Sequence, residues 1–559
     1  MIRSTKAPAG HINLKIVCAL VLIVIIGFFL RVYRLDKNIP SLYADEAGGH
    51  YNSWVLLNSP GGGIVNKVFE GMVSYTWLLG LTPLGARLPS AVYGSLAIVA
   101  LYFLAKALTD SHAVGLLTAI LGIVIPWLFM LSRIGFVYIP LLIIFVSIHV
   151  AMFVRASKPR DYAISLIPLV ISAFLYPSII IISGLVLIFT CVQIYETAGR
   201  TGRRLMIPIV LGSAALIASL LFWKYHGFSL QSRGIDLAIW RDVNVTAESN
   251  LYRGLSRLSG PTIFSFGKSA ESIGNKIVYN YPFSVLGVFF KNYLSFFSPE
   301  FLFLKGDTTL RQSTGMTGSF FLVLLPFMIY GLYLIVRNGT RNTKMVVLFW
   351  ILVSPIPGAI TRDGPGYLFR VVTMMPFLTF LSAFGIINFL RSLALIWRLI
   401  AGLVISIALV YSTYAFLFGY FHVYPQLAAR NYEFGFKELS DFQFASGNVA
   451  MLVIWDGYYP SRYFRFWQQT PGDDYLDYRT SDLSFGLSVF YQRFPNLYFS
   501  LPKTEEDLMG FVKKERIPYW AVSDEFLKKN PEYRQRDEMI AQIIKYPDNT
   551  DDFVIYKSY

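Results

Sequence analysis

Residues 14–54 read "LKIVCALVLIVIIGFFLRVYRLDKNIPSLYADEAGGHYNSW". Residues 14–32 are apolar apart from Lys15 and Arg31 near the two ends. That is about the 20 residues that a helix needs to cross the hydrocarbon core of a bilayer. Beyond this run the stretch becomes polar, and Asp45 and Glu46 stand side by side. We therefore predict a membrane-spanning helix followed by a loop that carries two neighbouring carboxylates.

The composition of the whole chain also indicates a membrane protein. Of the 559 residues 55% are hydrophobic and only 15% are charged, and the mean hydropathy is +0.51. Soluble globular proteins carry about 25% charged residues. Cys18 and Cys191 lie far apart in apolar runs, so no disulfide framework or cysteine metal site is expected. We expect a lipid bilayer around the protein and no nucleic-acid partner.

Eleven apolar segments are long enough to span a membrane. We take the first segment as an uncleaved helix, because "FFLRVYRLD" offers no small-residue cleavage site. Pro177 separates two adjacent segments. The predicted spans are 14–32, 87–108, 112–131, 136–154, 161–176, 177–195, 205–223, 319–336, 345–360, 367–390 and 398–420.

The distribution of Lys and Arg over the short loops predicts the orientation. With the N-terminus inside, the inner segments are 1–15, 155–161, 196–204, 337–344 and 391–398, and they hold 14 basic residues against 2 acidic ones. We therefore expect a multi-pass protein of the plasma membrane with a cytoplasmic N-terminus. The loops 33–86 and 224–318 and the tail would then lie outside the cell.

The tail has a different pattern from the rest of the chain. Its apolar runs shorten to strand length in "VAMLVIWD", "NLYFSL", "PYWAVSD" and "FVIYKSY". Segments such as "TEEDLMGFVKKE" lie between them and have the apolar spacing of a helix. We predict a transmembrane domain over residues 1–424 and an extracytoplasmic α/β domain over residues 425–559.

Charged residues collect at the predicted outer ends of the spans rather than in their middles. Arginine forks match the oxygens of a lipid phosphate, and a nearby carboxylate can accept a proton from a hydroxyl. The alternative for each charge taken singly is simple contact with water or lipid headgroups. The charged residues at these ends are Asp45, Glu46, Arg87, Arg133, Arg362, Asp363 and Arg370.

Several motifs resemble the polyprenyl-phosphate-sugar-dependent membrane glycosyltransferases of the GT-C fold. This superfamily includes the protein O-mannosyltransferases, the lipid A aminoarabinose transferases and the glycosyltransferase family 39-like proteins. The motifs keep the family's order over roughly residues 14–425. They are "LYADEAGGHYNSW", "GARLPSAVYGSLAIVALYFLAKAL", "SRIGFVYIPLLIIF", "FLYPS", "KNYLSFFSPEFLFLKGD" and "SPIPGAITRDGPGYLFRVVTMMPFL".

The resemblance implies an inverting transfer of a hexose or pentose from a polyprenyl-phosphate donor to an acceptor hydroxyl on a glycan, lipid or protein. Asp45 would be the base, and Glu46 would orient the base or the acceptor. Arg87, Arg133 and Arg370, or alternatively a divalent metal, would stabilise the charge on the departing phosphate. No cofactor is certain from these motifs.

The sequence also departs from the family's patterns. Gly71 in "FEGMVSYTWLL" replaces the lysine of a Phe-Glu-Lys-Pro motif, and "SRIGFVYIP" lacks the acidic residue of many relatives. We therefore do not carry over a lipid A role or a second acidic site. The sequence does not predict the sugar or the acceptor.

Other residues are weaker candidates for substrate binding. His50 could join a metal site four residues after Glu46, or be an ordinary interfacial histidine. Aromatic residues such as Tyr51 could stack on a sugar or belong to the aromatic belt. The remaining candidates are Glu70, Glu300, Asp307 and Arg362. Two other functions stay open: a transporter or flippase of a lipid-linked sugar, and a non-catalytic sugar-binding relative.

Overall fold

The computed structural model describes residues 14–39, 41–59, 63–176, 179–198, 211–215, 218–219, 237–258, 277–457, 460–469, 491–494, 496–502 and 504–558. Its contacts divide the chain into two units. The helical unit comprises Met1–Leu30, Tyr93–Leu131 and Tyr138–Phe416. The α/β unit comprises Arg31–Val92, Ser132–Val137 and Leu417–Tyr559.

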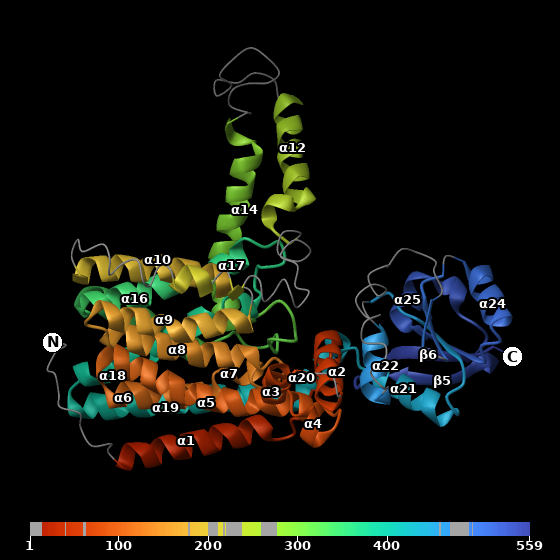
Figure 1. The fold of residues 1–559 in the computed structure, drawn as a ribbon, viewed down its shortest axis with the longest axis horizontal. Helices are drawn as coiled ribbons and strands as arrows, with labels where there is room; N and C mark the ends of the chain where they lie inside the picture. The colour runs from red at the N-terminus through yellow and green to blue at the C-terminus, as the bar shows by residue number, and fades with distance from the viewer. Residues whose placement is uncertain are drawn as a thin grey trace. The chain divides into compact units, whose positions relative to one another are not determined.

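Long apolar helices make up most of the helical unit (Figure 1). Seven helices among the described residues are long and apolar enough to cross a membrane, so the predicted helical, multi-pass architecture is confirmed. The helices are α1 (Leu14–Val32), α5 (Pro83–Thr109), α6 (His112–Val124), α7 (Pro126–Leu131), α8 (Tyr138–Arg155), α9 (Pro159–Leu175), α10 (Ile179–Ala198), α12 (Val243–Leu258), α14 (Tyr281–Ser295), α15 (Leu325–Asn338), α16 (Arg341–Val353), α17 (Ile356–Ala359), α18 (Met375–Ser392) and α19 (Leu395–Phe418).

Some of the predicted spans differ from the helices observed. The segment 112–131 is two helices, because Pro126 biases the residue before it away from the α region, and Ile125 is extended. The segment 367–390 begins with two short 3₁₀ turns, and its α-helix, α18, starts only at Met375. The segment 205–223 lies outside the described residues except for 211–215 and 218–219.

Close helix packing in the helical unit depends on small residues. α15 packs against α18. A Cβ atom on Gly331 would lie 2.2 Å from the Leu381 carbonyl oxygen, and one on Gly385 would lie 1.9 Å from the Phe327 carbonyl oxygen. Both glycines therefore allow the two backbones to approach closely, as small residues do in membrane helix pairs.

The α/β unit contains one six-stranded sheet with strand order β2-β3-β1-β4-β6-β5. The central strand β1 is parallel to β3 and β4, and the other pairings are antiparallel. This sheet confirms the predicted C-terminal α/β region. Its strands are β1 (Met451–Ile454), β2 (Tyr491–Phe494), β3 (Leu497–Ser500), β4 (Tyr519–Ser523), β5 (Ile540–Lys545) and β6 (Asp551–Lys557).

Some helices of the α/β unit belong to the C-terminal region with the sheet, and others to the segment between α1 and α5. They are α2 (Ala44–Asn58), α3 (Ile64–Val73), α4 (Thr76–Leu79), α20 (Tyr424–Ala428), α21 (Phe436–Ala445), α22 (Pro460–Gln468), α24 (Glu505–Lys514) and α25 (Asp524–Lys529). One apolar core joins β4 and β6 to α24 and α25.

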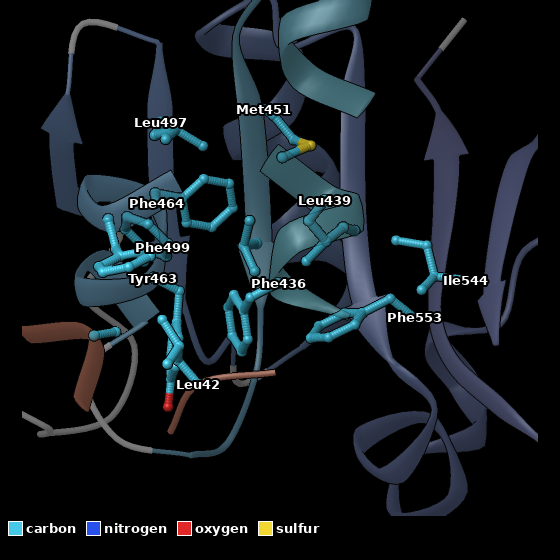
Figure 2. Close-up of a cluster of buried hydrophobic side chains, with 14 of the residues drawn as sticks. Leu42, Phe436, Leu439, Met451, Tyr463, Phe464, Leu497, Phe499, Ile544 and Phe553 are labelled. Atoms are coloured by element: carbon cyan, nitrogen blue, oxygen red, sulfur yellow. The ribbon is translucent and has the colours of Figure 1, made fainter. Parts of the chain in front are cut away.

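A second apolar core joins the sheet to α21 and α22 and includes Leu42, Ala47 and Tyr51 from the segment between α1 and α5. Figure 2 shows Leu42 beside Tyr463 of α22 in this core. The helix that carries Asp45 and Glu46 is therefore packed into the same core as the C-terminal sheet.

Candidate active site

Asp45 and Glu46 occupy the first turn of α2, where negative charge is favourable at a helix N-terminus. Neighbouring residues on a helix point about 100° apart, so the two carboxylates have different environments. The Glu46 side chain is fully buried, whereas 56% of the Asp45 side chain is exposed. The adjacent pair therefore consists of one internal carboxylate and one that faces solvent.

Glu46 is held by a two-point contact with Arg87, whose side chain is also fully buried. Arg87 Nε donates to Glu46 Oε1 at 3.2 Å, and Nη2 donates to Oε2 at 3.1 Å. The same guanidinium donates to the carbonyl oxygens of Ile39 and Ser41, at 3.3 Å and 2.5 Å. In this arrangement Arg87 donates to protein groups. Its contact with a donor phosphate stays a prediction.

The "SRIG" turn at residues 132–135 closes the other side of Glu46. The Gly135 amide donates to Glu46 Oε1 at 2.5 Å. A Cβ atom at Gly135 would lie 2.6 Å from His50 Nε2 and 3.1 Å from Glu46 Oε1, so a larger residue does not fit without movement. The absence of a side chain at Gly135 therefore allows the close approach of α2.

His50 continues this buried network. Its Nε2 lies 3.0 Å from the Gly135 carbonyl oxygen, and its Nδ1 lies 3.0 Å from Ser74 Oγ, which in turn lies 2.9 Å from Thr76 Oγ1. Burial lowers the pKa of His50, although the Glu46 carboxylate opposes this change. The imidazole thus joins α2 to the "SRIG" turn and to the residues before α4.

Arg133 is also fully buried and bonded to protein groups. Its Nε donates to the Tyr420 hydroxyl at 2.8 Å, and Nη1 donates to the Arg31 carbonyl oxygen at 2.6 Å. Nη2 donates to the Tyr33 carbonyl oxygen at 2.9 Å. Arg133 therefore ties the "SRIG" turn to the end of α1, and its donors, like those of Arg87, point to protein groups.

Asp45 has one ionic partner among the described residues, and it comes from the C-terminal part of the chain. Arg462 Nη1 of α22 donates to Asp45 Oδ1 at 2.9 Å. One turn further along α2 is Gly49, which is exposed and has open space around the position of a Cβ atom. The solvent-facing side of α2 is therefore open next to the Asp45 carboxylate.

Another carboxylate, that of Glu70 in α3, contacts α2 farther along the helix. Ser53 Oγ donates to Glu70 Oε2 of α3 at 2.6 Å, and burial raises the pKa of Glu70. Tyr51 faces the other way, since it is 4% exposed and belongs to the apolar core with α22. Its ring is thus part of the protein core in this structure, whereas the sequence left open a contact with sugar.

The remaining predicted residues lie in the helical unit. Asp307 is 4% exposed and accepts hydrogen bonds from the amides of Thr309 at 2.7 Å and Leu368 at 2.5 Å. Burial raises its pKa to about 7. Gln312 accepts from the Phe369 amide at 3.0 Å. These contacts fix the segment that leads to Arg370.

Arg370 is partly buried and pairs with Asp363, which is half-exposed. Its Nη1 lies 2.7 Å from Asp363 Oδ1, and Nη2 lies 2.8 Å from Oδ2. Arg362 is exposed, and Glu300 forms an exposed ion pair with Lys305. Of the three arginines predicted to bind phosphate, Arg87 and Arg133 are fully buried, whereas Arg370 pairs with a carboxylate that is exposed to solvent.

The described residues contain no group of three or more His, Cys, Asp or Glu side chains that could hold a metal ion. In particular, the ring nitrogens of His50 contact Ser74 and Gly135.

Sequence reasoning did not identify Gly135, Ser53 or Arg462 as members of the site. The glycine in "SRIG" was a usable signal, because it follows a buried arginine within a matched motif. Arg462 is separated from Asp45 by 417 positions and lies in a helix outside every matched motif.

No family model matches the sequence, and no curated protein sequence matches it. Among solved structures, the chain is similar to the oligosaccharyltransferase AglB from Archaeoglobus fulgidus in complex with an inhibitory peptide and a dolichol-phosphate. The identity is 12%, the match covers 93% of this chain and 70% of AglB, and the TM-score is 0.48.

The chain is also similar to ArnT from Cupriavidus metallidurans bound to undecaprenyl phosphate. There the identity is 12%, the match covers 96% of this chain and 98% of ArnT, and the TM-score is 0.47. Both neighbours have the GT-C fold of the glycosyltransferases that the sequence motifs resemble.

Proposed function

We propose that the protein is an inverting glycosyltransferase that moves a sugar from a polyprenyl-phosphate donor to an acceptor hydroxyl at the outer face of the membrane. The observation that carries the proposal is that the two adjacent carboxylates differ in their exposure to solvent. Asp45 faces solvent beside an open helix face, whereas Glu46 is buried against Arg87. The sequence resemblance supports the donor class and the outward orientation of this loop.

In the proposed reaction, an Asp45 oxygen accepts the proton of the acceptor hydroxyl. The acceptor oxygen then attacks the anomeric carbon as the bond from that carbon to the phosphate oxygen breaks. The polyprenyl phosphate leaves with the bonding electron pair, and the new glycosidic bond has the inverted configuration. Because phosphate is a good leaving group, no second carboxylic acid is needed, unlike in the hydrolysis of a glycosidic bond.

Glu46 would act only indirectly in this scheme. Its carboxylate is fully buried and accepts hydrogen bonds from Arg87 and the Gly135 amide. We infer that Glu46 fixes the first turn of α2 and so holds Asp45 at the open face. This differs from direct orientation of the acceptor, which the resemblance also allows.

The proposal is tested with purified protein in nanodiscs and a panel of polyprenyl-phosphate sugars, following the release of free polyprenyl phosphate. Asp45→Asn keeps the size of the side chain and removes its basicity, so turnover should fall about a hundredfold or more. Donor binding should persist, because no phosphate contact is removed. Near wild-type turnover of Asp45→Asn would rule out Asp45 as the base. Movement of the lipid-linked sugar across the bilayer without transfer would favour a transporter.

A further inference from the structure

α22 brings a cation to the proposed base from the C-terminal part of the chain. The Arg462 side chain is 10% exposed, and its Nη1 lies 2.9 Å from Asp45 Oδ1. The neighbouring residues Tyr463, Phe464 and Phe466 are fully buried in the apolar core. Ser461, on the other side of Arg462 in the sequence, is fully buried as well. Arg462 therefore belongs to a well-packed helix.

The same core holds α2. Ala47 and Tyr51, which lie two and six residues after Asp45, pack in one cluster with the three aromatic residues of α22. The helix of the carboxylate and the helix of the guanidinium are thus parts of one packed assembly, shown in part in Figure 2. Their contact is built on regular secondary structure rather than on a loop, which favours a defined geometry.

The form of this contact differs from that of the Glu46–Arg87 pair. Arg87 contacts both oxygens of Glu46, whereas Arg462 contacts Asp45 through Nη1 and Oδ1 alone. Among the described residues, Asp45 Oδ2 accepts no hydrogen bond. A single contact restricts the rotation of an exposed carboxylate and leaves its second oxygen for another donor, such as an acceptor hydroxyl.

We propose that Arg462 is a positioning residue for the transfer reaction: it orients the Asp45 carboxylate so that Oδ2 faces the acceptor. The C-terminal α/β segment thereby completes the active site. This inference rests on the proposed function. A misplacement of about 1 Å in a reacting group can cost about a hundredfold in rate, so loss of this contact should reduce turnover.

The test is a double-mutant cycle of Arg462→Gln and Asp45→Asn in nanodiscs, with turnover and both KM values measured. Arg462→Gln should lower kcat about ten- to a hundredfold with KM values for donor and acceptor changed less than about threefold. In the Asp45→Asn background the same change should have no further effect, because the group that it positions is gone. Arg462→Lys, which keeps the charge, should recover part of the loss.

The matched control is Lys529→Gln, which breaks ion pairs with Asp456 and Glu525 in the same unit. It should leave turnover unchanged. If Arg462→Gln does not fold, Arg462→Lys takes its place in the cycle. It should lower kcat by a smaller factor, and it should have no effect on kcat in the Asp45→Asn background. The positioning role would be overturned if Arg462→Gln lowered kcat by the same factor in the Asp45→Asn background as in the wild type. Faster turnover in Arg462→Gln would overturn it as well. Full activity of Asp45→Asn would instead rule out Asp45 as the base, and a wild-type protein that releases no polyprenyl phosphate from any donor would overturn the proposed function itself.

Discussion

The Arg87 guanidinium contacts both carboxylate oxygens of Glu46, and neither side chain is exposed to solvent. A buried ion pair is stable only when hydrogen bonds satisfy its remaining donors and acceptors. Here the carbonyl oxygens of Ile39 and Ser41 accept from Arg87, and the Gly135 amide donates to Glu46. The pair therefore joins the polar segment before α2, the start of α5 and the "SRIG" turn.

Glu46→Gln should consequently reduce stability more than a typical surface change. It leaves the Arg87 charge buried without a counter-ion, and breaking a buried pair in this way costs about 3–5 kcal/mol. The measurement is the unfolding midpoint and the free energy of unfolding of the purified protein in detergent. Arg341→Gln is the matched control, because its pair with Glu196 is exposed, and it should cost less than about 1 kcal/mol. Equal stability of Glu46→Gln and wild type would contradict the role given to this pair.

Gly135→Ala should disturb the site through its backbone. The added methyl group would lie 2.6 Å from His50 Nε2, so either the imidazole or the "SRIG" turn must move. We expect a loss of about 1–3 kcal/mol in stability together with lower turnover. Gly184→Ala, at a helix position with nothing within 4 Å, is the control and should leave both quantities almost unchanged. A Gly135→Ala protein as stable and active as wild type would show that this close approach is not needed.

The sequence predicts the architecture well because long apolar runs and strand-length runs are local signals. The break at Pro126 was equally local, yet we predicted one span over 112–131. The sequence could not predict that Glu46 is buried and Asp45 exposed, because "ADEAGGHYNSWVLLN" has no strong helical pattern and contains two glycines. Arg87 and Arg133 were predicted at phosphate depth from their place at span ends. Nothing in the sequence indicates that distant carbonyl oxygens and Glu46 accept their hydrogen bonds.

The pH dependence of stability should contain a contribution from Asp307. Its folded-state pKa of about 7 lies above the ordinary value of 3.8, so between these values the folded protein retains a proton that the unfolded chain has lost. This proton stabilises the folded state at low pH, and the stabilisation is lost as pH rises from about 4 to about 7. Asp307→Asn should remove this part of the slope, a change of about 4 kcal/mol across the window.

Unfolding midpoints of wild type and Asp307→Asn at several pH values between 4 and 8 measure this difference. Glu300→Gln is the control in the same region, because its carboxylate is exposed and paired with Lys305. It should leave the slope unchanged. Parallel curves for wild type and Asp307→Asn would show that Asp307 has an ordinary pKa in the folded protein.

The last prediction concerns the donor phosphate, for which we test Arg370 as the ligand. The guanidinium groups of Arg87 and Arg133 are fully buried among protein acceptors, so Lys at either position should reduce stability rather than donor affinity alone. Arg370 instead pairs with the half-exposed Asp363. The guanidinium carbon of Arg370 also lies 5.3 Å from the centre of the Tyr367 ring. A phosphate could take the place of the Asp363 carboxylate at the same two donors, because both groups match the arginine fork.

Arg370→Lys keeps the charge but removes the fork, so the KM for the polyprenyl-phosphate sugar should rise about tenfold while the acceptor KM changes little. Arg362→Lys is the matched control, since Arg362 is exposed in the same segment and should change donor KM less than about twofold. Asp363→Asn tests the role of Asp363. If Asp363 holds Arg370 in place, donor KM should rise in this variant as well, though less than in Arg370→Lys. Unchanged donor kinetics in Arg370→Lys would exclude an arginine clamp at this position, and a divalent metal supplied with the donor would then be the better account of how the phosphate is held.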